Sequence, residues 1–277
     1  MMNNIEKIIE EYNSLGINQQ LDYDKFYLYS IITHSTAIEG STITEIENQL
    51  LFDEGLGSNK PIKEQMMNLD LKKAYEKSFE YAKNHEKITV EMLCTLSGVL
   101  MQNTGSEYNT IAGNFSAAKG DLRLLNVSAG RGGKSYMAWQ KVPQKLQEFC
   151  DWLNGERKKL DNMSLEEKYK LSFEAHYQLV SIHPFADGNG RMGRLLMNMI
   201  QYEAGIVPSI VKKENRVEYI KSLSESQDKE DSSSFIDFMM NHHKDNLLQQ
   251  IDEYKKSIQS ESKQEHHKLK RSSGWSW

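Results

Sequence analysis

Apolar residues recur at three- and four-residue spacing through most of this chain, and that period limits its fold more than any other feature. The segments 22–38, 62–83, 90–102, 142–154 and 165–182 all carry it. Side chains spaced in this way fall on one face of an α-helix, and the face is buried against other elements. The pattern predicts an all-α protein, a helical bundle whose 277 residues form one large domain or one domain with an appendage.

Two further helices are expected at about 217–226 and 234–258. Pro184 ends the helix at 165–182, because proline disfavours helical geometry in the residue before it. The next helix is expected at about 191–205, because Gly205 and Pro208 are signals for a helix end. The motif discussed below therefore lies between two helices.

Two stretches depart from the helical period. The runs 122–127 and 134–138 are β-compatible and are separated by a glycine-rich turn, which predicts a β-hairpin. The stretch 257–277 is polar and aperiodic, so we expect a frayed or disordered tail. The expected division is an N-terminal helical region at 1–110, a core at 111–256 and the tail.

Composition excludes several classes of function. The formal net charge of −5 argues against nonspecific binding to nucleic acid or anionic membranes. No apolar run approaches the ~20 residues of a membrane span, and the acidic, amphipathic start is not a secretory signal. Cys94 and Cys150 each stand alone in an apolar stretch and are predicted to be core thiols. The expected location is a reducing, cytoplasmic compartment.

The stretch HPFADGNGRMGR, from His183 to Arg194, combines residue types that a packed core does not need. Gly188 and Gly190 can adopt backbone angles that other residues avoid, so the turn can direct its N–H groups toward one point. That point lies at a helix N-terminus, where free N–H groups and the helix dipole favour an anion. Two arginines in the first turn, the earlier being Arg191, are unfavourable there unless a polyanion lies in front of them.

The side chains of this stretch suit phosphate chemistry. Arg191, Arg194 and Asn198 share one helix face, and such a row fits a chain of phosphates. Asp187 suits Mg²⁺, which takes one or two carboxylates plus phosphate oxygens. His183 suits a general base near neutral pH. Each of these residues alone more often has a structural role. All of them together, at the spacing that places them around one point, favour a phosphate-binding site. The stretch has no Ser, Cys or Lys nucleophile, so the attacking group would come from the substrate.

The stretch resembles the Fic family signature, H-x-F-x-(D/E)-G-N-G-R-x-x-R, at every specified position, and the resemblance extends over about 20–245. It implies a Fic fold: a helical core that carries the motif between two helices, with a β-hairpin "flap" beside it. The implied activity is transfer of AMP from ATP to a Ser, Thr or Tyr hydroxyl of a protein. By this resemblance His183 is the base, Asp187 binds Mg²⁺ and Phe185 anchors the loop in the core.

The resemblance also implies the nucleotide contacts. Gly188, Asn189 and Gly190 would hold the α- and β-phosphates, and Arg191 and Arg194 the outer ones, with Arg194 on the γ-phosphate. The flap would be the hairpin between about 122 and 137, whose edge pairs with an extended target segment. Two flap residues are expected near the nucleotide and three residues of a later helix near the adenine: Gly133, Lys134, Tyr219, Ile220 and Gln227.

A second motif, STAIEG, lies near the end of an expected helix. Ser35, Glu39 and Gly40 match the family's inhibitory motif, S/T-x-x-x-E-(G/N), which marks one class when it is N-terminal to the core. A carboxylate at a helix C-terminus is unfavourable by about 0.3–1 kcal/mol. In the family this glutamate pairs with the γ-phosphate arginine, here Arg194, and misplaces ATP. In some members it also supports hydrolytic removal of AMP, an activity that the sequence leaves open.

These patterns favour a self-inhibited, Mg²⁺-dependent protein adenylyltransferase that acts on a hydroxyl-bearing protein, itself included. The intact Gly-Asn-Gly segment favours AMP transfer over phosphate transfer, while other nucleotide donors remain open. The alternative is a nucleotide-binding regulatory protein held shut by Glu39. A homodimer is compatible with the resemblance, and neither nucleic acid nor membrane is an expected partner. Adjacent histidines on a helix point about 100° apart, so His242 and His243 are expected at the surface rather than on a metal.

Overall fold

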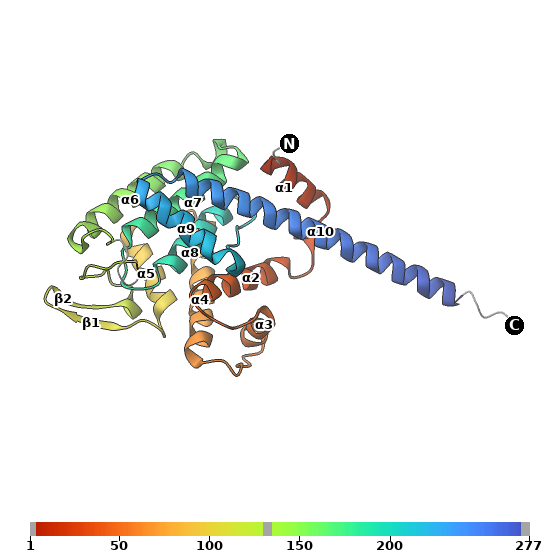
Figure 1. Cartoon of the computed structure of the whole chain (residues 1–277), viewed down its shortest axis with the longest axis horizontal. Coiled ribbons are helices and arrows are strands. Elements are labelled where there is room, and N and C mark those ends of the chain that lie inside the picture. Colours follow the sequence, from red (N-terminus) through yellow and green to blue (C-terminus); the bar gives the residue numbers. More distant parts are fainter. Residues whose placement is uncertain (1–3, 130–134, 273–277) are drawn as a thin grey trace.

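Helices make up most of the structure, a computed structural model that describes residues 4–129 and 135–272, with side chains up to residue 260 (Figure 1). The predicted all-α fold with a small hairpin is confirmed, and all five segments with helical period form helices. In the described residues the elements are α1 (Ile5–Ser14), α2 (Tyr23–Ile38), α3 (Glu45–Asp53), α4 (Ile62–Lys83), α5 (Val90–Met101), β1 (Glu107–Thr110), β2 (Gly113–Ser116), α6 (Val142–Arg157), α7 (Leu165–Ile182), α8 (Asn189–Glu203), α9 (Arg216–Lys229) and α10 (Ser233–Ser272).

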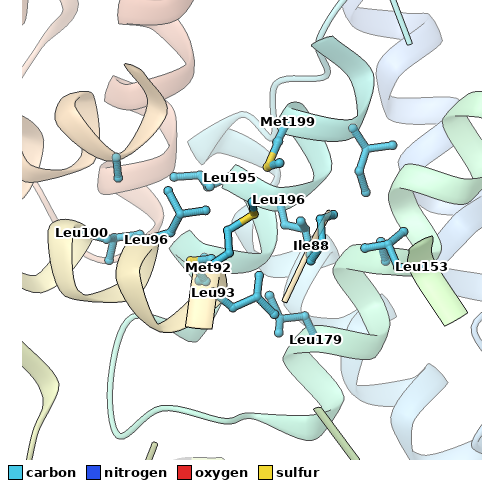
Figure 2. Close-up of a cluster of buried hydrophobic side chains, with 14 of the residues drawn as sticks. Ile88, Met92, Leu93, Leu96, Leu100, Leu153, Leu179, Leu195, Leu196 and Met199 are labelled. Carbon is cyan, nitrogen blue, oxygen red and sulfur yellow. The ribbon is translucent and has the colours of Figure 1, made fainter. Parts of the chain in front are cut away.

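Helix α8 is buried on all sides. It packs against α7, α4 and α5, and every side chain from Arg191 to Gln201 is buried. One side of it meets a hydrophobic cluster to which α5 contributes Leu96 and Leu100, and α7 contributes Leu179 (Figure 2). Burying each large apolar side chain contributes roughly 1.5–3 kcal/mol. This core therefore fixes the helix that carries the signature arginines.

One hydrophobic cluster crosses the boundary expected between residues 110 and 111. It takes side chains from α2, α4 and α5 on one side of that boundary and from α6, α7 and α8 on the other. A second cluster joins α1, α7, α9 and α10. Cys150 is buried and Cys94 half-buried in this packing, and both are free thiols, as predicted. Among the described residues, no helix is both long and apolar enough to cross a membrane.

A hairpin that the sequence did not predict precedes the expected one. β1 and β2 pair antiparallel, with Glu107 opposite Ser116. In the described part of the 122–137 region, one antiparallel bridge joins Ser128 and Ser135, and a backbone hydrogen bond next to it joins the same two runs. The side chain of Arg123 donates to one carbonyl group on each side of this region.

Helix α10 corrects two further expectations. It runs through residue 272, whereas the sequence predicts a frayed or disordered tail from residue 257. The stretch loses its apolar period but is rich in Gln, Glu, Lys and Ser, and the first three of these favour helix without any packing. The predicted surface position of His242 and His243 is also wrong. Both are buried, because α10 packs its first half against α7 and α9.

Candidate active site

The signature loop is closed by its own asparagine. The carboxamide of Asn189 accepts a hydrogen bond from the Phe185 N–H at 3.1 Å and donates one to the Phe185 carbonyl at 2.9 Å. Phe185 is itself 1% exposed and lies in the core, as predicted. The side chain of Asn189 therefore shapes the loop, which leaves its backbone N–H group for the space in front of α8.

Two glycines lie where the loop enters α8, and only Gly188 needs a backbone conformation that favours glycine. Gly188 has a φ of +80°, and a Cβ there would lie 2.9 Å from the sulfur of Met101. A Cβ on Gly190 would lie 2.9 Å from Oε1 of Glu39. The first intrahelical bond of α8 runs from the Met192 N–H to the Gly188 carbonyl at 2.8 Å. The N–H groups of residues 189–191 precede that bond and give the helix start its preference for an anion.

His183 is held with one ring nitrogen committed and the other available. Nδ1 lies 3.3 Å from the Val180 carbonyl, which can only accept a hydrogen bond, so Nδ1 carries the proton and Nε2 keeps its lone pair. The ring stacks on Tyr136 with 3.8 Å between centroids. Burial lowers the pKa of His183 to about 4, with a smaller contribution from the Arg123 charge. The imidazole is therefore neutral at physiological pH.

Arg194 binds the segment predicted to be inhibitory. Its Nε donates to the Ser35 hydroxyl at 2.8 Å, and its Nη2 donates to the Ser35 carbonyl at 3.0 Å and to Oε1 of Glu39 at 2.7 Å. The guanidinium is 2% exposed. The two motifs, 155 residues apart in sequence, thus meet in space. Gly40 follows with a φ of +102° beyond the end of α2.

The charges of three guanidinium groups act on the carboxylate of Glu39, and Arg194 contacts it directly. Burial alone would raise the pKa of this carboxyl, but Arg194, Arg191 and Arg216 outweigh burial and hold the pKa below its ordinary value of 4.5. Arg216 also donates to the Ile38 carbonyl at 2.7 Å. About a third of the Glu39 side chain, 36%, remains exposed. The space between these arginines and the start of α8 therefore already holds one anion, the Glu39 carboxylate. Three positive charges act on this one negative charge, so the anion pocket keeps a net positive charge.

Arg191 is buried and lacks partners for much of its guanidinium. It is 4% exposed, and Nη2 lies 3.2 Å from the sulfur of Met101 and 3.9 Å from Oδ1 of Asp187. Its Nε and Nη1 have no hydrogen-bond partner among the described residues. Buried, unpaired donors on a cation are costly, so this arrangement indicates a place for a further anion.

Asp187 fits the requirements of Mg²⁺. Its side chain is 62% exposed, and its Oδ1 accepts a hydrogen bond from the Gly188 N–H at 2.6 Å. The described residues contain no group of three or more side chains arranged as a metal site. Mg²⁺ usually takes one or two carboxylates and completes its shell with waters and phosphate oxygens. A single exposed carboxylate before a cationic helix start suits that mode of binding.

Two predicted nucleotide contacts have partners inside the protein. The carboxamide of Asn198 accepts from the Tyr75 hydroxyl and donates to Gln201 and to the Ser209 carbonyl. Tyr219 is buried, and its hydroxyl lies 3.3 Å from Nη1 of Arg194.

The remaining predicted contacts separate into three groups. Gln227 lines a cavity of about 450 Å³ together with Tyr136 and Met137, and its amide donates to the Ser181 hydroxyl at 3.2 Å. Ile220 is 42% exposed and does not line that cavity. Gly133 and Lys134 lie outside the described residues.

Sequence reasoning missed residues that contact the site from other elements. Arg123 donates to the His183 carbonyl, Tyr136 stacks on the His183 ring, and Arg216 contributes to the pocket around Glu39. A signal existed for Arg123, which is a lone cation inside the apolar run LRLLNV. No local pattern distinguishes Arg216 or Tyr136 from a surface residue, because their roles depend on tertiary contacts.

Comparison with known proteins finds one matching family. Residues 87–201 match the model of the Fic/DOC family. The chain is therefore similar to Fic/DOC proteins over this stretch. It is 26% identical over 230 residues to the protein adenylyltransferase fic-1 of Caenorhabditis elegans and 30% identical over 203 residues to the protein adenylyltransferase Fic of Drosophila melanogaster. These alignments cover 80% and 69% of this chain but only 41% and 36% of the relatives.

Solved structures agree with the Fic fold. A Fic domain containing signaling protein from Bacteroides thetaiotaomicron superposes with a TM-score of 0.74 at 22% identity, covering 91% of this chain and 98% of that one. Fic-1 from Caenorhabditis elegans superposes with a TM-score of 0.68 at 22% identity, covering 91% of this chain and 72% of that one. At these identities the similarity shows the fold alone, and the chemistry has to be argued from the site.

Proposed function

We propose that this protein transfers AMP from ATP to a hydroxyl group of a protein and that Glu39 inhibits the transfer. One observation carries the proposal. The Glu39 carboxylate lies 2.7 Å from Nη2 of Arg194 and against the first turn of α8 at Gly190. The protein's own anion thus fills a place suited to a phosphate. The relatives named protein adenylyltransferases support the choice of AMP transfer.

The side chains divide the work of the proposed reaction. The Nε2 lone pair of His183 accepts the proton of the target hydroxyl, whose oxygen then bonds to the α-phosphorus. The bond between that phosphorus and the bridging oxygen to the β-phosphate breaks, and pyrophosphate leaves. The start of α8, with Arg191 and Arg194, stabilises the phosphate charges. Asp187 would hold Mg²⁺, which when bound neutralises part of the charge on the phosphates.

Inhibition follows from competition for one guanidinium. Arg194 makes three hydrogen bonds to Ser35 and Glu39, so a γ-phosphate would have to displace the carboxylate or lie elsewhere. Two anions at one guanidinium repel each other, and the triphosphate would bind in a shifted position. A displacement of about 1 Å from the reactive geometry can lower a rate by about 10²-fold. The rival hypothesis is a nucleotide-binding regulator in which Glu39 makes the same contact with Arg194. Under that hypothesis, removal of Glu39 would not lead to AMP transfer.

The decisive experiment incubates the protein with α-³²P-labelled ATP, Mg²⁺ and cell lysate. The variants are wild type, Glu39→Gly and Glu39→Gly/His183→Ala, and Glu54→Gly is the matched control. Glu54 is also a glutamate at the end of a helix, exposed after α3. We expect label on protein only with Glu39→Gly. If Glu39→Gly stays unlabelled, AMP transfer from ATP is wrong, and γ-³²P-labelled ATP and other labelled nucleotides then distinguish another donor from the regulator.

A further inference from the structure

Arg123 joins the signature loop to the segment that covers it. Its Nε donates to the His183 carbonyl at 2.7 Å, its Nη1 to the Leu125 carbonyl at 2.7 Å and its Nη2 to the Met137 carbonyl at 2.5 Å. Its backbone N–H donates to the Pro184 carbonyl at 3.0 Å. One residue therefore holds two successive peptide units of the signature loop and both sides of the 122–137 region.

This arrangement requires the guanidinium group. Arg123 is 1% exposed, and within the described chain its side chain donates only to carbonyl groups. Burying a cation is costly, and three charge-assisted hydrogen bonds offset that cost. A planar fork of donors reaches three separate carbonyls at once, whereas the ammonium group of lysine is a compact point charge. The position is therefore specific for arginine rather than for positive charge.

The residues that Arg123 holds are the ones that orient the proposed base. His183 has a φ of +52°, a left-handed conformation that is uncommon for a residue with a side chain and persists only where the surroundings hold it. Arg123 binds the carbonyl group of that same residue. Tyr136 precedes Met137, whose carbonyl is held too, and its ring lies against the imidazole at 3.8 Å and 20°.

We propose that Arg123 is a positioning residue of the transfer reaction: through the carbonyls of His183 and Met137 it holds the imidazole of His183 and the ring of Tyr136 face to face. The stack keeps the ring from rotating, so Nε2 points in one direction, and it excludes water from one face of the base. This inference rests on the proposed function. It goes beyond that function by assigning roles to two residues outside the signature.

The test compares variants in the Glu39→Gly background. Arg123→Lys keeps the charge and removes the fork, and Tyr136→Ala removes the stack. Arg157→Lys is the matched control, because Arg157 is a buried arginine that pairs with Glu203 away from the site. We expect Arg123→Lys and Tyr136→Ala to lower kcat by about 10- to 100-fold while KM for ATP changes less than about threefold. The Arg157→Lys control should keep the parent kcat.

A second readout needs no transfer activity. NMR titration of the histidine rings, with His183 assigned by His183→Asn, measures the pKa of the base directly. Besides the Val180 carbonyl, Arg123 and Asp187 are the charged groups that influence this ring. We expect a value of about 4 in the parent, an increase of at least about one unit in Tyr136→Ala as the ring becomes exposed, and a low value again in Tyr136→Phe.

The outcomes separate the two proposals. If Glu39→Gly does not transfer AMP, the proposed function fails, while the titration still tests the contact between His183 and Tyr136. If Glu39→Gly is active and Arg123→Lys keeps both its kcat and the pKa of His183, the positioning role is wrong. If Arg123→Lys does not fold, Tyr136→Ala decides, and an unchanged kcat with an unchanged pKa overturns the inference.

Discussion

At the scale of single residues, the contact between Ser35 and Arg194 offers a graded test of inhibition. The Ser35→Ala change removes the hydroxyl that accepts from Nε of Arg194 at 2.8 Å but leaves Glu39 in place. A hydrogen bond to a charged group contributes about 1.5–3 kcal/mol, only part of which holds the inhibitory contact. We expect a rise in AMP transfer of roughly 3- to 10-fold, below that of Glu39→Gly. Ser30→Ala, on the same helix, is the control, and equal rates in the two serine variants would contradict the prediction.

The rate of the proposed reaction should fall only at an unusually acidic pH. Burial lowers the pKa of His183 to about 4, so its neutral, proton-accepting form persists as the pH falls to that value. We expect kcat/KM of Glu39→Gly to fall as the pH drops through about 4 rather than through the ordinary histidine value of 6.5. Brief assays between pH 3.5 and 8 measure this, and a limb near 6.5 would show that the ring is exposed in the free enzyme.

Residue positions were predictable where a motif carries the information. The resemblance of two separate motifs implied the pairing of Glu39 with Arg194, and the structure brings that pair to 2.7 Å. Asn198 was expected to face the phosphates because it follows Arg194 by four residues. It faces Tyr75 of α4 instead, because α8 is buried on every side and each side chain on it meets a different neighbour. A helix period cannot distinguish two buried faces.

At the scale of elements, a buried amide network fixes the end of α2. The side-chain oxygen of Asn68, in α4, accepts hydrogen bonds from Thr36 at 2.8 Å and from Asn48 at 2.9 Å. Its nitrogen donates to the Ser41 hydroxyl at 3.2 Å and to the Glu64 carbonyl at 2.8 Å. This one side chain joins α2, α3 and the segment after Gly40. It therefore fixes the backbone on both sides of Glu39.

Removing this amide should release inhibition and lower stability together. Asn68→Ala removes four hydrogen bonds from this buried network, which is expected to cost about 2–4 kcal/mol in the free energy of unfolding. We expect it also to raise AMP transfer with Glu39 still present. Urea unfolding and α-label transfer measure the two effects, with the exposed Asn84→Ala at the end of α4 as control. A loss of stability without any gain in transfer would show that the network does not control Glu39.

Elements with strong local signals were predicted, and elements formed by side chains were not. Ser164 and Glu167 have the spacing of a capping box in the sequence, the box forms, and α7 begins after it. Among the described residues the β-compatible runs around Arg123 meet in one bridge, and the guanidinium donates to one carbonyl group in each run. A lone arginine in an apolar run is visible in the sequence, but the carbonyls that it will bind are not.

At the scale of the whole molecule, buried histidines should make the fold sensitive to mild acid. Burial lowers the pKa of His176 and His243 to about 3, and of His183 to about 4. Between these values and 6.5 the unfolded chain binds protons that the folded chain does not, so stability is lost as the pH falls through that window. Each histidine contributes up to about 1.4 kcal/mol per pH unit.

Urea unfolding at pH 7 and pH 5 tests this expectation. We expect a lower midpoint at pH 5 and a smaller difference between the two pH values in His243→Leu, which removes one of the buried groups. His85→Leu is the control, because the His85 ring is 74% exposed. Equal midpoints at the two pH values would mean that the buried rings become protonated without unfolding.

The order of the two contacting motifs along the chain has a consequence for synthesis. Ser35 and Glu39 precede Arg194 by 159 and 155 residues, so the ribosome completes α2 long before α8 emerges. Domains generally fold as units, and α2 and α8 share one hydrophobic cluster. The carboxylate is therefore present when the guanidinium is made, and the folding step that brings α2 against α8 fills the anion pocket as it forms it. Under the proposed function, a newly made molecule is therefore inhibited from the moment that it folds.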